Sequence, residues 1–142
     1  GEEGDALPAR IAGEDGFDVA LSSSALEHVR DLDQAIAQLR RSTTSDARHL
    51  HAVNFGNHRS KEQPLSEVYA LSPDDYRARF GTHINLQRSS DLLECFQRHG
   101  IHVELHPYYA VDAIGIPITW WSTRYTPEVL QLAVGLFADR AT

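Results

Sequence analysis

The chain has 142 residues, of which 42% are hydrophobic and 23% charged, a composition typical of one folded domain with a single core. Its net charge of −7 argues against a nucleic-acid surface, which needs a stripe of Lys and Arg that this sequence lacks. No apolar run approaches the ~20 residues of a membrane span, so no membrane partner is expected. Cys95 is the single cysteine, and we predict a buried thiol and a cytoplasmic location.

The first predicted strand covers residues 17–22 and is apolar enough to be covered on both faces. It runs into three serines, then Glu27 and His28, before the next helix. Ligands bind at the carboxyl ends of strands in a parallel α/β sheet, because backbone groups are free there and loops can be shaped around a bound molecule. The segment is therefore predicted to be a site as well as a core strand.

A helix is predicted after this segment. Asp31 or Asp33 can cap it, and it extends to about Arg41, because apolar residues recur in this stretch with helical spacing. Residues 42–46 are polar and are predicted to form a turn.

The second predicted strand covers residues 48–54. Side chains alternate between the two faces of a strand, so Leu50 and Ala52 share one face, and His49 and His51 share the other. The strand therefore presents two imidazoles side by side.

Residues 56–87 break every periodicity and are predicted to be a long, lid-like insertion, with one short helix start near its middle. Ser89 or Ser90 is expected to cap the following helix, and Gly100 to end it in a left-handed conformation. A third, half-buried strand is predicted over residues 101–107.

Several segments, taken in order, resemble the C-terminal half of a class I S-adenosylmethionine-dependent methyltransferase. They are Glu3-Gly4-Asp5-Ala6-Leu7-Pro8, Gly16-Phe17-Asp18-Val19, Ser22-Ser23-Ser24-Ala25-Leu26-Glu27-His28-Val29, and Asn85 to Asp91 before the helix that ends at Gly100. The resemblance implies one α/β domain over residues 1–142, with a partial Rossmann-like sheet of strand order 4-5-7-6 that lacks the first strands. It also implies a final strand at about 130–138 after a short helical turn, where propensity alone favours a helix.

The sequence departs from the family pattern at three places. The strand and glycine-rich turn that hold the cofactor's methionine end are missing from this chain. The Pro-Gly-Gly turn common in the family is Asp-Ala-Arg at residues 46–48, and Asn54 stands where relatives often carry Asp.

The resemblance implies roles for four residues near the first strand. Asp5 would accept a hydrogen bond from the adenine amino group, with the backbone of Ala6 close to the ring, and Ser22 would approach the methionine moiety through its backbone. His28 is the candidate for general acid/base catalysis, since an imidazole can take a proton from a hydroxyl or amine as the methyl group arrives. The alternatives are a polar N-terminal arm, a helix-capping serine turn, and a histidine that orients its loop through Glu27.

Substrate-binding candidates follow the second strand and end the insertion: His51, Asn54, His58, Asn85 and Arg88. Arg88 could fix an anionic or carbonyl group, or it could anchor the insertion onto the sheet. His49, His51 and His58, together with Asn54, raise the possibility of a metal, because imidazoles suit zinc or iron. Their spacing matches no standard zinc signature, and no acid or thiolate stands beside them, so we predict no metal.

These interpretations predict S-adenosylmethionine-dependent methyl transfer to a small-molecule substrate, as part of a complete enzyme. The alternative is a non-catalytic remnant that acts as a binding or scaffold domain. Residues 17–22 would lie at one edge of the sheet, and an apolar edge strand favours association. We therefore expect a longer protein with a missing N-terminal half, a homodimer, or an unusual cover for this strand.

Overall fold

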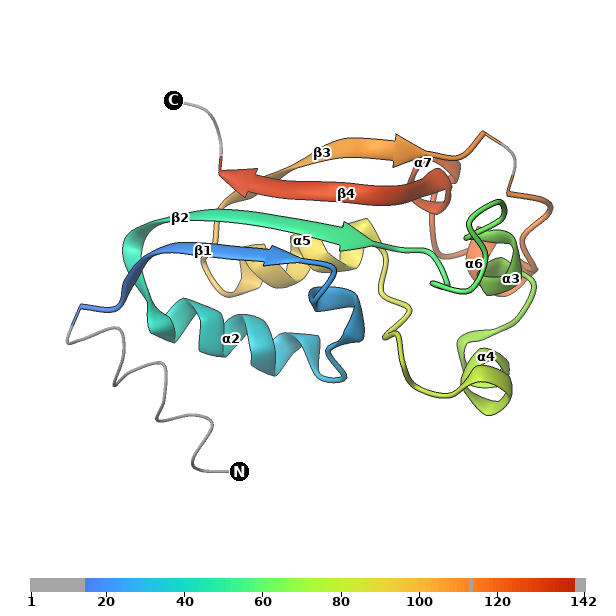
Figure 1. Cartoon of the computed structure of the whole chain (residues 1–142), viewed down its shortest axis with the longest axis horizontal. Coiled ribbons are helices and arrows are strands. Elements are labelled where there is room, and N and C mark those ends of the chain that lie inside the picture. The colour runs from blue at the N-terminus through green and yellow to red at the C-terminus, as the bar shows by residue number, and fades with distance from the viewer. Residues whose placement is uncertain (1–14, 113, 140–142) are drawn as a thin grey trace.

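Four strands form one open sheet in the computed structural model, which describes residues 15–112 and 114–139 (Figure 1). The strands are β1 (Phe17–Ser23), β2 (Thr43–Asn54), β3 (Val103–Ala110) and β4 (Leu132–Asp139). Their order across the sheet is β1-β2-β4-β3, which is the order expected for these four segments. The chain therefore has an α/β architecture with a mixed sheet and flanking helices.

Strand β1 lies at one edge of the sheet, as expected, and pairs in parallel with β2. Their register places Leu21 opposite Leu50 and Ser22 opposite His51. Strand β4 is antiparallel to both β2 and β3. The carboxyl ends of β1 and β2 consequently meet at the same end of the sheet, where the predicted site begins.

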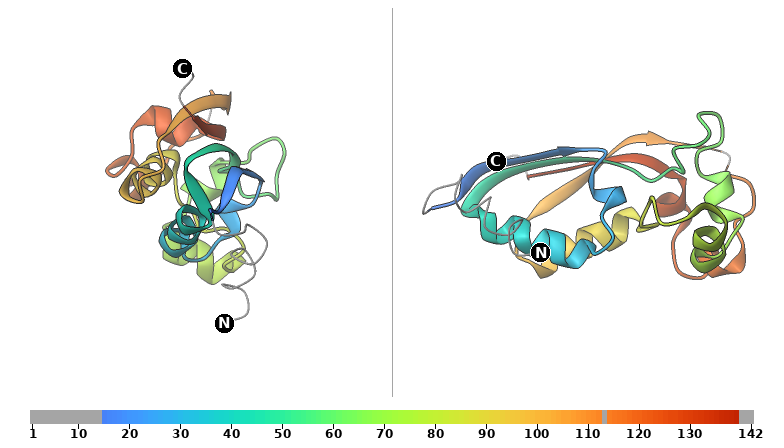
Figure 2. Two further views of the ribbon diagram at one scale, coloured as in Figure 1. Left: turned by 90° about the vertical axis from the view of Figure 1, so that its left-hand side faces the viewer. Right: turned by 60° about the horizontal axis from the view of Figure 1, so that its bottom comes forward.

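Two helices, α2 (Leu32–Ser42) and α5 (Ser89–Arg98), cover one face of the sheet (Figure 2). Asp31 caps α2, because its side chain accepts a hydrogen bond from the amide of Gln34 at 3.0 Å. The prediction that a serine caps α5 is wrong: the N-cap is Arg88, whose amide donates to Asp91 Oδ2 at 2.7 Å. Gly100 follows α5 with a φ of 74°, as predicted.

No helix in the described part of the chain covers the other face of the sheet (Figure 2). Val19, Leu21 and Leu50 are 55%, 70% and 44% exposed on it. The expectation that β1 is covered on both faces is therefore not met by these residues. An apolar sheet face of this kind is unusual on a protein that acts alone.

Strand β2 begins at Thr43, so the predicted polar turn over residues 42–46 is wrong. The Thr43 hydroxyl donates to the carbonyl of Leu39 at 3.0 Å, and Arg40 Nη1 donates to the carbonyl of Thr43 at 3.2 Å. These bonds let the chain pass from α2 into the strand without a separate loop. The expected tail is confirmed, with helix α7 (Pro127–Gln131) directly before β4.

The insertion packs at the end of the sheet and contains two helices, α3 (Ser66–Tyr69) and α4 (Pro73–Phe80), close to α6 (Thr119–Ser122) (Figure 1). Tyr69 donates to the carbonyl of Leu130, and Trp121 Nε1 donates to that of Leu71, both at 2.7 Å. Tyr76 and Trp121 are fully buried. The insertion is therefore fixed by its own buried Tyr69, which bonds the segment before β4, and by Trp121 of α6, which bonds the insertion.

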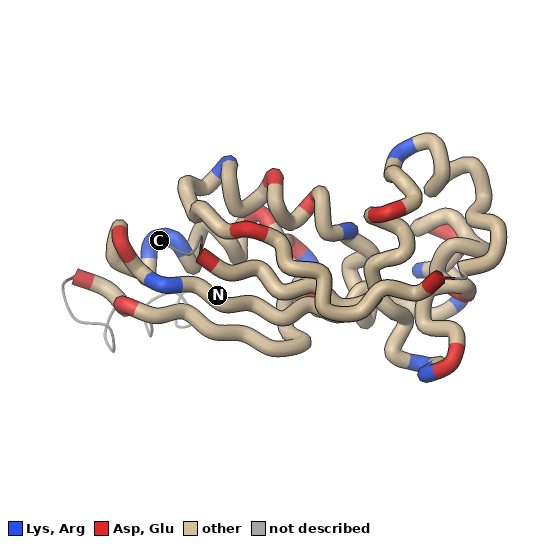
Figure 3. The backbone as a smooth tube through the Cα atoms, turned by 90° about the horizontal axis from the view of Figure 1, so that it is seen from above, with Lys and Arg blue, Asp and Glu red and all other residues tan. Residues whose placement is uncertain are grey.

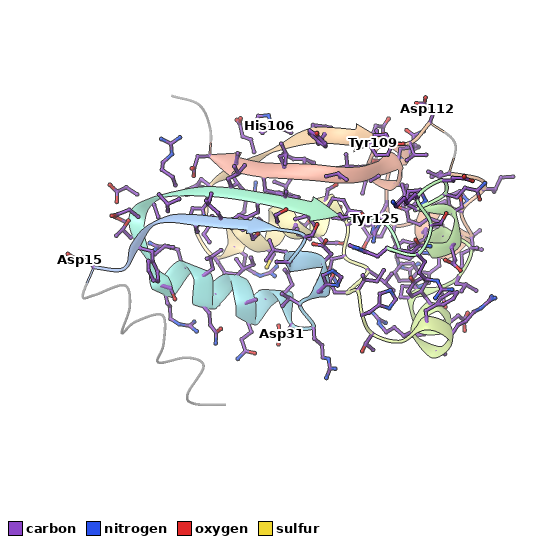
Figure 4. All side chains as sticks on the ribbon, viewed as in Figure 1. Asp15, Asp31, His106, Tyr109, Asp112 and Tyr125 are labelled. Atoms are coloured by element: carbon purple, nitrogen blue, oxygen red, sulfur yellow. The ribbon has the colours of Figure 1, made fainter. Side chains whose placement is uncertain are left out.

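Lys and Arg are intermixed with Asp and Glu along the described backbone, and they form no basic stripe there (Figure 3). His106 and Tyr109 project from β3, at the edge of the sheet opposite β1 (Figure 4). Among the described residues, no helix combines the length and the apolarity that a membrane crossing requires.

Candidate functional site

The loop after β1 is a short 3₁₀ helix, η1 (Leu26–His28), and Asn85 holds it from the far end of the insertion. The Asn85 amide donates to the carbonyl of Glu27 at 2.7 Å. Its side-chain Nδ2 donates to the carbonyls of Leu26 and Val29 at 2.8 and 2.9 Å. Asn85 was predicted to bind substrate, but its side chain is engaged by this loop, so we assign it a positioning role.

Glu27 is the least expected member of the site. It is only 4% exposed, yet within the described residues neither of its carboxylate oxygens receives a hydrogen bond. A buried carboxylate without a donor is costly, because the interior does not replace the water it has lost. Sequence reasoning treated Glu27 only as a partner that could orient His28. The only sequence feature that could have indicated a buried Glu27 is its position between an apolar residue and a histidine, in Leu26-Glu27-His28.

His28 and His58 lie above this carboxylate, with ring centroids 4.8 Å apart. His58 Nε2 is 3.5 Å from Glu27 Oε1. His28 Nδ1 donates a hydrogen bond to the carbonyl of His83 at 2.6 Å. Because a carbonyl only accepts, this bond fixes the proton on Nδ1 and leaves Nε2 of a neutral ring free to accept a proton or bind a ligand.

His58 is presented by a tight turn. Asn57 is fully buried, and its Oδ1 accepts hydrogen bonds from the amides of Arg59 and Ser60 at 3.0 and 3.1 Å. His58 itself has a φ of 58°, a left-handed conformation uncommon outside glycine. Two effects act on the pKa of His58 in opposite directions: partial burial lowers it, and the nearby Glu27 carboxylate raises it. Burial has the larger effect, so the pKa lies below its ordinary value.

The described residues contain two sets of three side chains whose metal-ligating atoms lie within 4.8 Å of one another: Glu27 with His28 and His58, and Asp33 with Cys95 and His99. In the second set, Asp33 Oδ1 already bonds Arg98 at 2.7 Å and His99 at 2.8 Å. Cys95 is buried, as predicted, and burial raises the pKa of its thiol. The second set is therefore a salt-bridge cluster beside an inert thiol.

The histidines of β2 lie on the face covered by the helices. His51 is 1% exposed, stacks on Phe96 with centroids 5.4 Å apart, and bonds Ser22 Oγ through Nδ1 at 2.8 Å. His49 Nδ1 is 3.3 Å from His51 Nε2. His51 was predicted to contact substrate, but in this structure its ring is enclosed by the sheet and α5. The prediction that His49 and His51 share a face is confirmed.

The side chains of the remaining described candidates, Asn54 and Arg88, form hydrogen bonds within the protein. Asn54 Oδ1, at the end of β2, accepts a hydrogen bond from the Gly56 amide at 2.8 Å. Arg88 is 1% exposed and donates through Nη1 to the carbonyl of Phe55 at 2.9 Å and to the Tyr69 hydroxyl at 3.1 Å. This geometry favours the second of the two interpretations of Arg88, an anchor for the insertion. Asp5 and Ala6, predicted to contact cofactor, lie outside the described residues.

Comparisons with protein-family models, with curated proteins and with solved structures found no match. The functional assignment therefore depends on the sequence motifs and on the geometry of this site.

Proposed function

We propose that the chain is the acceptor-side part of an S-adenosylmethionine-dependent methyltransferase that acts on a small molecule. The observation that carries this proposal is the position of His28, which is exposed at the shared carboxyl end of β1 and β2 with its Nδ1 proton fixed by the carbonyl of His83. Ligands of open α/β sheets bind at this end of the strands.

The chain's own residues would supply placement and proton transfer. S-adenosylmethionine supplies an electrophilic methyl group, and the hydroxyl or amine that receives it must lose a proton. His28 Nε2 is the atom that takes this proton, and Asn85 holds the loop in place through the bonds to Leu26 and Val29. Placement of the nucleophile contributes more than strong base catalysis to an in-line displacement.

Cofactor binding is assigned to the complete enzyme. Of the three residues implied to contact S-adenosylmethionine, only Ser22 lies in the described part of the chain, and its hydroxyl is engaged by His51. Ser22 would thus contribute backbone contacts alone, and the described residues do not form a complete cofactor site.

Titration with S-adenosylhomocysteine, followed by amide NMR shifts, tests the proposal. We expect shifts concentrated at Ser22, Ser23 and Ser24 and at η1, with helix α4 unchanged as an internal control. If the ligand binds but the shifts fall at α4 or along β3, the proposed site is wrong. If millimolar ligand produces no shift, this chain alone does not hold the cofactor, which leaves the scaffold alternative or a domain that binds cofactor only within the complete enzyme.

That alternative has one specific observation in its favour, the exposed apolar face of β1 and β2. Leu21 and Leu50 are cross-strand neighbours there and are 70% and 44% exposed. A scaffold domain would use this face to bind a partner or a second copy. Sedimentation at several concentrations would show self-association that Leu21→Lys abolishes, whereas a monomer at all concentrations would count against a homodimer.

A further inference from the structure

We propose that Glu27, His28 and His58 bind one divalent transition-metal ion of the zinc and iron class. The proposal does not depend on methyl transfer, because the three side chains come together in the structure whatever reaction the site performs. An ion bound to His28 Nε2 would occupy the lone pair that takes the substrate proton in the proposed methyl transfer, so the two roles of this nitrogen exclude each other in one molecule. Sequence spacing gave no sign of this set, since His58 is separated from the Glu27-His28 pair by the whole of α2 and β2.

The ligating atoms are already near coordination geometry. Zinc binds imidazole nitrogen and carboxylate oxygen at about 2.0–2.2 Å, so neighbouring ligand atoms on one tetrahedral ion stand roughly 3.3 Å apart. Glu27 Oε1 and His58 Nε2 are 3.5 Å apart, and the ligand atoms of all three residues lie within 4.8 Å of one another.

The buried carboxylate is the independent observation that points to a cation. Glu27 is 96% removed from solvent and receives no hydrogen bond at either oxygen from the described residues. Its contact with His58 at 3.5 Å is too long for a good hydrogen bond. A buried anion is retained when it is paired or coordinates a metal, so a divalent ion supplies the compensation that the protein itself does not.

The surroundings of the set already provide the support that metal ligands require. Metal-bound histidines commonly donate their second ring N–H to a carbonyl or carboxylate, which fixes the tautomer and aims the free nitrogen at the ion. His28 does this through the 2.6 Å bond from Nδ1 to the carbonyl of His83. The Asn57 turn fixes the backbone of His58, and Asn85 fixes that of Glu27.

The ligand types select the class of ion. Two imidazoles and one carboxylate suit zinc or ferrous iron, whereas magnesium and calcium prefer oxygen ligands throughout. Three protein ligands leave one or more coordination positions open for water or for an oxygen of a small molecule. Both histidines are exposed, so the site is reachable from solvent.

Zinc binding to the chelator-stripped chain tests the proposal directly. Calorimetric titration with zinc chloride should show one equivalent, and cobalt(II) at the same site should give the visible absorption of a low-coordinate ion. Glu27→Gln keeps the shape of the side chain, and His58→Asn suits the left-handed backbone because Asn tolerates that conformation. Each should weaken zinc binding by about tenfold or more.

His99→Ala is the matched control, because it removes an imidazole from the Asp33 cluster, and it should leave the zinc affinity unchanged. Binding that survives both Glu27→Gln and His58→Asn, or that is lost in His99→Ala, would overturn the proposal. So would the absence of a zinc-dependent signal at micromolar metal. Because His58 is exposed, His58→Asn tests the site even if Glu27→Gln disturbs folding, which circular dichroism would reveal.

Discussion

The structure contains two close pairs of histidines, and they differ in almost everything except residue type. His49 and His51 face α5, are buried, and bond each other and Ser22. His28 and His58 are exposed on loops above a buried carboxylate. Burial makes an imidazole a neutral packing group, whereas exposure beside an unsatisfied anion leaves it free to bind a proton or a metal. The histidines of the strand support the structure, and those of the loops form the candidate site.

The sharpest contrast is in stability. His51→Ala should lower the free energy of unfolding by about 3–4 kcal/mol, because it leaves a cavity against Phe96 and removes the partner of Ser22 Oγ. His28→Ala should cost less than about 1 kcal/mol, since its ring is exposed. Urea unfolding measures both values. Equal costs for the two substitutions would remove the distinction between the pairs.

The pH dependence of stability separates the pairs in a second way. Burial holds the pKa of His51 at about 4, below its ordinary 6.5, with His49 adding to the shift and Asp139 opposing it. The unfolded chain therefore takes up a proton first, and the stability that His51 confers is complete above pH 6.5 and lost as the pH falls toward 4. The loss reaches about 3 kcal/mol.

Thermal unfolding from pH 7.5 to 4 measures this dependence. His51→Gln should flatten it relative to the original chain, while His102→Gln, on an exposed residue, should not. An unchanged slope in His51→Gln would show that other groups dominate acid sensitivity.

Sequence reasoning succeeded where local pattern and packing agree. The strand at residues 17–22, the Asp31 cap and Gly100 all lie where local chemistry sets the conformation. The tail strand β4 followed from the resemblance and not from propensity, which favoured a helix. The turn at residues 42–46 was wrong because pairing with β1, a long-range interaction, extends β2 back to Thr43.

The candidate site was recovered only in part, for a physical reason. His28 was recognised because it lies in the short segment between the first strand and the next helix. His58 was named as a candidate, but its proximity to Glu27 and His28 was not predicted. The role of Glu27 depends on burial, which no local pattern encodes. Arg88 and Asn85 were read as ligand contacts because polar side chains after a long loop suit that role, yet both bond main-chain carbonyls from distant segments. The spacing of residues in the sequence does not predict hydrogen bonds between such distant segments.

Asn85 offers a smaller test that links the insertion to the site. Asn85→Ala removes both donors from the carbonyls of Leu26 and Val29, and should lower the free energy of unfolding by about 1–2 kcal/mol. Hydrogen exchange at η1 should accelerate, while exchange in β4 changes only with global stability. Gln63→Ala, on an exposed loop residue, should leave η1 unchanged. Protection of η1 that is insensitive to Asn85→Ala would contradict the positioning role.

Glu27→Gln should have the smallest effect and the opposite sign. In metal-free protein it should raise the free energy of unfolding by about 1 kcal/mol, because it removes a buried charge that has no hydrogen-bond donor. Glu67→Gln is the control: Glu67 accepts from Asn57 Nδ2 and pairs with Arg59, so this substitution should not stabilise. Destabilisation by Glu27→Gln in metal-free protein would mean that the carboxylate already has effective partners.

The most direct test of the contrast between the pairs is an NMR titration of the histidine ring Cε1–H signals with zinc, assigned by single substitutions. We expect the signals of His28 and His58 to move or broaden together at one equivalent, while those of His49 and His51 keep their positions. Movement of the His49 and His51 signals, or of none of the four, would contradict the assignment of the loop histidines as the functional pair.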